Sequence, residues 1–123
     1  MKGTHPALRL NERDCRRKVA VRVGQEFELR LPENPTAGYR WRLVESGGPV
    51  CSLAGDVFEP GEKPGQAGVH CWRFRITAAG STRVGLVYRR NWEGPAVAPR
   101  QFVIELAVTP AGWSRNRRRD PHR

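Results

Sequence analysis

The chain has 123 residues with a formal net charge of +10, long enough for one buried core but too short for two ordinary domains. Its longest stretch without Asp, Glu, Lys or Arg is the ten residues 46–55, about half of what a bilayer-spanning helix needs, so a transmembrane helix is excluded. The N-terminus has no apolar segment of signal-peptide length. The chain is therefore expected to be cytoplasmic as written, or secreted or periplasmic if a leader has been removed.

Most of the positive charge lies towards the two ends. Residues 1–18 carry six basic and two acidic side chains, and residues 115–123 carry five Arg and one Asp, so each segment contributes +4 and the rest only +2. We expect a basic N-terminal segment over residues 1–18, one folded domain over 19–110, and a disordered Arg-rich tail over 111–123. The folded domain is expected to be a monomer, and nucleic acid binding is expected only through the basic ends.

Apolar and polar residues alternate repeatedly along the chain, which predicts half-buried strands. The alternation is clear in six segments: 19–23, 27–31, 39–43, 70–76, 84–88 and 102–108. Between Leu43 and His70 the pattern is weaker and Gly and Pro interrupt it, so one or two short edge strands are expected there. The sequence, rich in turn residues and without helical periodicity, predicts an all-β, immunoglobulin-like antiparallel β-sandwich of seven to eight strands. A five-stranded oligonucleotide-binding barrel is the alternative, although it has fewer strands than the sequence predicts.

The apolar phase of these strands is the expected core. Its members are Val19, Val21, Val23, Phe27, Leu29, Leu31, Tyr39, Trp41, Leu43, His70, Trp72, Phe74, Ile76, Val84, Leu86, Tyr88, Phe102, Ile104, Leu106 and Val108. Gly24 is expected to turn the chain between the first two strands. Gly85 is expected to mark a bulge or a close approach of two backbones.

Patterns typical of catalysis or metal binding are missing from the sequence. His70, on the apolar phase of a strand, is expected to be a packed or rim histidine, and the other histidines lie near the ends of the chain. No serine lies in a G-x-S-x-G motif and no cysteines form a C-x-x-C pair. We therefore expect no enzyme, no cofactor and no metal site. The three cysteines are expected to be unpaired thiols, with a bridge between Cys51 and Cys71 as the alternative: Cys15, Cys51 and Cys71.

Three loops stand out against this plain β pattern. Residues 34–39 read N-P-T-A-G-Y, where a proline fixes φ and a glycine permits positive φ, so the loop is expected to be stiff. Residues 65–68 read G-Q-A-G, a loop with few side-chain atoms whose backbone can approach a partner closely. Residues 90–92 read R-N-W at a strand end, and exposed Arg and Trp are typical of binding hot spots.

Taken together and in this order, the three loops resemble those of the chagasin family, proteinaceous inhibitors of papain-like cysteine peptidases. That family has an N-P-T-T-G-Y/F loop, a G-x-x-G-type loop and an R-P-W loop, and the resemblance spans residues 19–108. It implies an immunoglobulin-like sandwich whose three adjacent loops enter the peptidase cleft as a reversible, non-covalent wedge. The implied peptidase-binding residues are Asn34, Pro35, Thr36, Ala37, Gly38, Tyr39, Gly65, Gln66, Ala67, Gly68, Arg90, Asn91 and Trp92.

The resemblance also implies a role for each loop. Thr36 would lie nearest the catalytic Cys–His pair of the peptidase, the 65–68 loop would lie along one rim of the cleft, and Arg90 with Trp92 would grip the other. This chain has Ala37 for the second threonine and Asn91 for the proline of R-P-W. Without that proline the free loop has more conformations, so weaker binding is expected. The alternatives are a basic β-domain that binds single-stranded nucleic acid and a sandwich interaction module without inhibitory function.

Overall fold

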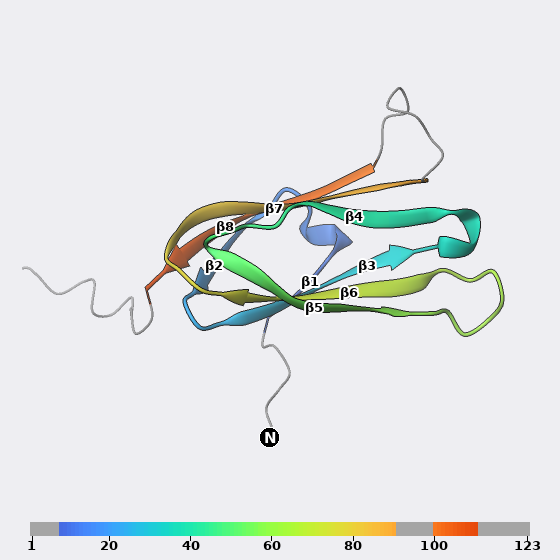
Figure 1. The fold of residues 1–123 in the computed structure, drawn as a ribbon, viewed down its shortest axis with the longest axis horizontal. Coiled ribbons are helices and arrows are strands. Elements are labelled where there is room, and N and C mark those ends of the chain that lie inside the picture. Colours follow the sequence, from blue (N-terminus) through green and yellow to red (C-terminus); the bar gives the residue numbers. More distant parts are fainter. Residues whose placement is uncertain (1–7, 91–99, 111–123) are drawn as a thin grey trace, which may run out of the picture.

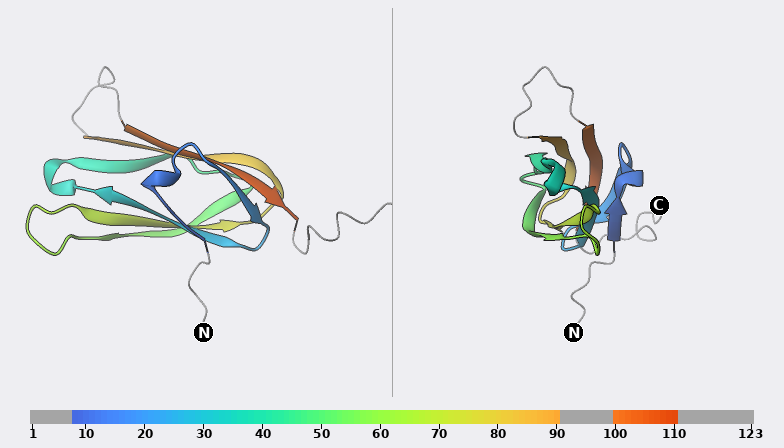
Figure 2. Two further views of the ribbon diagram at one scale, coloured as in Figure 1. Left: turned by 180° about the vertical axis from the view of Figure 1, so that it is seen from behind. Right: turned by 90° about the vertical axis from the view of Figure 1, so that its right-hand side faces the viewer.

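The computed structural model describes residues 8–90 and 100–110, which form two four-stranded sheets packed face to face (Figures 1 and 2). One sheet has the order β1-β3-β6-β5 and the other β2-β8-β7-β4. The strands are β1 (Leu8–Asn11), β2 (Lys18–Arg22), β3 (Glu26–Glu33), β4 (Tyr39–Glu45), β5 (Cys51–Glu59), β6 (Gly68–Ile76), β7 (Gly80–Arg90) and β8 (Arg100–Thr109), with two short 3-10 helices, η1 (Glu12–Asp14) and η2 (Pro35–Ala37). The prediction of an all-β sandwich is confirmed. Neither helix among the described residues could cross a bilayer.

Two strand pairings are parallel, which the expected antiparallel arrangement did not include. β1 pairs with β3 and β2 pairs with β8 in parallel, while the other four pairings are antiparallel. Gly24, at a φ of +93°, turns the chain between β2 and β3 as predicted. This turn carries the chain from one sheet into the other, so β2 does not pair with β3 and takes β8 as its neighbour instead.

The inner faces of the two sheets form one core from the residues that alternation predicted. Phe27 and Phe74 lie opposite each other on β3 and β6 and stack with ring centroids 4.9 Å apart. Tyr39 and His70 are on the same phase but lie near the end of the sandwich and are only partly buried. The buried cluster also contains Leu10, Val50 and Cys51, which the alternation did not indicate.

Two strands differ from the expectation. β1 lies inside the segment assigned to a basic N-terminal extension, and its Leu10 is 3% exposed against the core. β5 is one nine-residue edge strand rather than one or two short ones. Its register shifts between Leu53 and Gly55, so the strand has no regular alternation of buried and exposed side chains.

Gly85 and the cysteines follow the expectation. The β4–β7 register shifts beside Gly85, which confirms the bulge, and a Cβ at Gly85 would lie 3.0 Å from the side-chain oxygen Glu45 Oε1 rather than from another backbone. All three cysteines are free thiols. The Cys51 Sγ donates to the Ser46 carbonyl at 3.3 Å, and burial raises the pKa of this thiol to about 11.

Candidate functional site

Strand ends from both sheets meet at one end of the sandwich, which we call the loop end (right-hand side of Figure 1). It carries the β3–β4 loop (residues 34–38), the β5–β6 loop (residues 60–67), the last residue of β7 and the first of β8. The strand register places these segments at the same end of the sheets, because Glu33 lies opposite Gly68, Tyr39 opposite Arg90 and Tyr88 opposite Arg100. The sequence motifs around residues 34–39, 65–68 and 90 are thus brought together.

The β3–β4 loop is closed by its own hydrogen bonds. Pro35 starts the 3-10 turn, Gly38 ends it at a φ of +88°, and the Gly38 N–H donates to the Pro35 carbonyl at 2.9 Å. The Thr36 hydroxyl donates to Asn34 Oδ1 at 2.7 Å, although the Thr36 side chain is exposed at the tip. The predicted stiffness therefore has a physical basis in the fixed φ of Pro35 and in the hydrogen bonds that close the turn.

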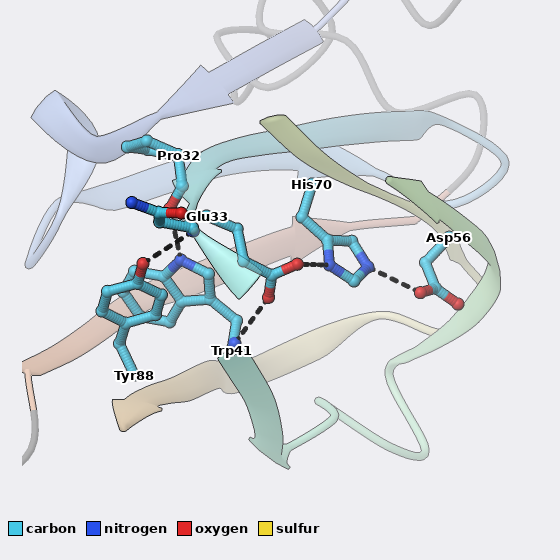
Figure 3. Close-up of polar contacts among 7 residues, drawn as sticks. Pro32, Glu33, Trp41, Asp56, His70 and Tyr88 are labelled. Carbon is cyan, nitrogen blue, oxygen red and sulfur yellow. Dashed lines mark hydrogen bonds and ion pairs between the residues drawn. The ribbon is translucent and has the colours of Figure 1, made fainter. Parts of the chain in front are cut away.

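The N-terminal side of this loop is held by aromatic side chains of the other sheet (Figure 3). The Asn34 N–H donates to the Tyr88 hydroxyl at 2.9 Å, and the Trp41 indole N–H donates to the Pro32 carbonyl at 2.8 Å. Tyr88 stacks between Tyr39 and Trp41, with ring centroids 5.2 Å and 4.7 Å away. The loop thus stands on a packed aromatic base that joins the two sheets.

Arg90 connects the end of β7 to the β3–β4 loop. Its Nε donates to the Ala37 carbonyl at 3.1 Å, and its guanidinium lies 4.5 Å from the centroid of the Tyr39 ring, a cation–π contact. The Arg90 side chain therefore supports the neighbouring loop from within the protein. Asn91 and Trp92, which complete the third motif, lie outside the described residues.

The β5–β6 loop depends on its glycines. Gly65 has a φ of +79°, and a Cβ at Gly68 would lie 2.3 Å from the Glu59 carbonyl oxygen and 2.5 Å from the Phe58 ring. Gln66 and Ala67 between them are exposed. A G-x-x-G pattern alone is a weak signal, but here one glycine is needed for the turn and the other for the close approach of two strands.

An open groove of about 330 Å³ separates the two described loops. Asn34, Pro35 and Thr36 line one side, and residues 60–66 with Phe58 line the other. The described part of the loop end therefore forms two ridges with an open groove between them. Loops that project from a rigid scaffold in this way are a common binding surface.

Glu33 is a residue of this region that the sequence reasoning missed. It is 1% exposed, and its Oε2 accepts the Trp41 N–H at 2.7 Å. Because β4 is the outer strand of its sheet, alternate N–H groups point away from β7 and need another partner. Its position in the sequence could have indicated it, because Glu33 continues the alternation of Phe27, Leu29 and Leu31. A carboxylate on the buried face of a strand is unusual.

Comparison with known proteins identifies the family. The model of the chagasin family peptidase inhibitor I42 matches residues 20–106. The chain belongs to the chagasin family. It is 32% identical over 95 residues to chagasin of Trypanosoma cruzi, an alignment that covers 72% of this chain and 86% of chagasin. The family consists of peptidase inhibitors and not enzymes, so the predictions of an inhibitor and of no enzyme are both confirmed.

Solved structures show the same fold. The cysteine protease inhibitor EhICP2 from Entamoeba histolytica superposes with a TM-score of 0.75 at 20% identity, covering 83% of this chain and 95% of EhICP2. PbICP-C, solved in complex with falcipain-2, superposes with a TM-score of 0.61 at 13% identity, covering 89% and 96% of the two chains. The chain is thus similar over nearly its whole described length to chagasin-fold inhibitors.

Proposed function

We propose that this protein inhibits papain-like cysteine peptidases by inserting its loop end into the substrate cleft as a reversible, non-covalent wedge. The observation that carries the proposal is the hydrogen bond from Arg90 Nε to the Ala37 carbonyl at 3.1 Å, which joins the strand leading into the third motif to the loop of the first. Two of the three motif regions thereby belong to one surface.

The rigidity of this surface supports tight binding. The β3–β4 loop is closed by internal hydrogen bonds and stands on the Tyr39–Tyr88–Trp41 stack, so little conformational freedom is lost on docking. An interface of about 800 Å² per partner formed by such preorganised loops can reach nanomolar affinity, about −12 kcal/mol. Chagasin-family membership and the fold shared with a cysteine protease inhibitor support the same target class.

Titration of papain with the protein tests the proposal. We expect competitive inhibition, with full recovery of papain activity and of intact inhibitor after dissociation. Thr36→Arg places a bulky charge at the exposed tip and is expected to weaken inhibition about 100-fold or more, equivalent to about 3 kcal/mol. Ser81→Arg is the matched control, because Ser81 is exposed near the opposite end of β7 and the change in charge is the same. Equal inhibition by both variants, or none by the natural chain, would refute the wedge.

A further inference from the structure

A chain of polar contacts runs beneath the two described loops and crosses both sheets (Figure 3). It starts at the Trp41 N–H on β4, which donates to Glu33 Oε2 on β3 at 2.7 Å. Glu33 Oε1 lies 2.9 Å from His70 Nδ1 on β6, and His70 Nε2 lies 2.6 Å from Asp56 Oδ2 on β5. Four strands are thus connected by three side chains: Glu33, His70 and Asp56.

The burial of Glu33 explains why it needs these neighbours. A carboxyl group as buried as Glu33 must find polar partners inside the protein to offset the loss of water, and the structure supplies two, the Trp41 backbone N–H and the His70 ring. The His70 ring in turn uses both of its nitrogens, Nδ1 towards Glu33 and Nε2 towards Asp56.

The His70 ring is also held by packing. It stacks on the Trp72 indole with centroids 4.0 Å apart and planes 2° from parallel, and the Phe58 ring lies edge-on at 6.3 Å. The side chain is 13% exposed, whereas that of Asp56 is 46% exposed. A fixed ring thus presents one nitrogen to the interior and the other to the edge strand β5.

The positions of the end members relate this network to the loops. Glu33 directly precedes the β3–β4 loop, and Asp56 lies three residues before the end of β5, where the β5–β6 loop begins. Among the described strands, β5 is the outer strand of its sheet and has β6 as its one neighbour. A side-chain tie from β5 through β6 to β3 and β4 therefore limits how far one loop can move relative to the other.

We propose that Glu33, His70 and Asp56 are positioning residues that set the distance between the β3–β4 and β5–β6 loops, and that tight inhibition needs this distance to be fixed. The proposal rests on the proposed function. Two ridges fit a given cleft only when the distance between them matches the cleft. If that distance varies in the free protein, the freedom is lost on binding, and this entropy loss weakens the complex. His70 is thus a link between two binding loops rather than only a packed side chain.

Asp56→Ala tests the network at its exposed member, where the fold depends on the side chain least. We expect inhibition of papain to weaken roughly fivefold, mainly through faster dissociation, while urea unfolding shows that the variant stays folded under the conditions of the assay. Asp56→Asn keeps an oxygen that can accept from His70 Nε2 and is expected to recover most of the loss. Glu105→Ala is the matched control, because Glu105 is also an exposed acidic residue and lies on β8 of the other sheet, away from β5. Equal effects of Asp56→Ala and Glu105→Ala would overturn the proposal.

Hydrogen exchange provides a readout that needs no peptidase. Amides of the β5–β6 loop are expected to exchange roughly fivefold faster in Asp56→Ala than in Glu105→Ala, because only the first variant removes the contact between Asp56 on β5 and His70 Nε2. If the natural chain fails to inhibit papain, the proposed function falls, and the exchange comparison still decides the network: a difference supports it and equal rates reject it. If the natural chain inhibits and both comparisons show no difference, only the network is refuted.

Discussion

Replacing Tyr88 by Phe removes one hydroxyl from the base of the β3–β4 loop and leaves the aromatic stack in place. The hydroxyl accepts the part-buried Asn34 N–H at 2.9 Å, and the variant leaves that N–H without this partner. An unsatisfied buried donor costs about 1–2 kcal/mol, so the free energy of unfolding is expected to fall by that amount. The midpoint of thermal unfolding is expected to fall by roughly 5 °C.

Urea denaturation followed by tryptophan fluorescence measures this loss, with an unchanged m-value showing that only stability has changed. Tyr39→Phe is the matched control, because it removes the same atom from the ring stacked on Tyr88, and its hydroxyl has no hydrogen bond within the described residues. The control is expected to change stability by less than about 0.5 kcal/mol. Equal stability of Tyr88→Phe and Tyr39→Phe would refute the anchoring of Asn34 by Tyr88.

Three further predictions concern the third loop, a buried thiol and the tail. Asn91→Pro, outside the described residues, is expected to tighten inhibition of papain by about 0.4–1 kcal/mol through a stiffer free loop; unchanged or weaker inhibition would count against Asn91 standing at the family's proline position. Burial raises the pKa of the Cys51 thiol from 9.0 to about 11, so the folded chain keeps a proton that the unfolded chain loses. The free energy of unfolding should therefore fall as the pH rises from 9 to 11, and less so in Cys51→Ala; the same pH slope in both proteins would contradict this. Deleting residues 115–123 is expected to leave the inhibition constant unchanged, whereas binding of single-stranded nucleic acid through the tail would be lost; loss of inhibition would assign the tail a role in the complex.

Alternation predicts the central strands well because their two faces meet different surroundings. β3 buries every second side chain fully and the others only in part, and β6 alternates between buried and exposed from Trp72 to Ile76, so the apolar residues repeat with period two. The motif loops could also be located, because proline fixes φ and glycine permits a positive φ whatever surrounds them. The register of the strands then brings residues 34–39 and 65–68 to the same end.

β1 and β5 could not be predicted in the same way, because long-range pairing rather than local pattern forms them. β1 has four residues and gains its structure by pairing in parallel with β3. β5 is an edge strand with an irregular register, and its Leu53 and Val57 are 39% and 55% exposed, so no period-two pattern arises. Neither strand carries a local signature that distinguishes it from a loop.

The polar network could not be derived from the sequence for a related reason. The partners of Glu33 are the Trp41 backbone and the His70 ring, which lie eight and 37 positions away along the chain. Only folding brings these groups together. The sequence shows a carboxylate on a buried phase before a loop, which is a reason to look for donors but does not name them.

Hydrogen exchange of the protein, free and bound to papain, tests most directly whether the loop end is the surface that meets the peptidase. We expect protection on binding in residues 34–38 and 60–67 and at the adjoining ends of β7 and β8, with little change around the Gly24 turn at the other end of the sandwich. Protection centred on that turn, or unchanged exchange in residues 34–38 within a stable complex, would contradict the wedge.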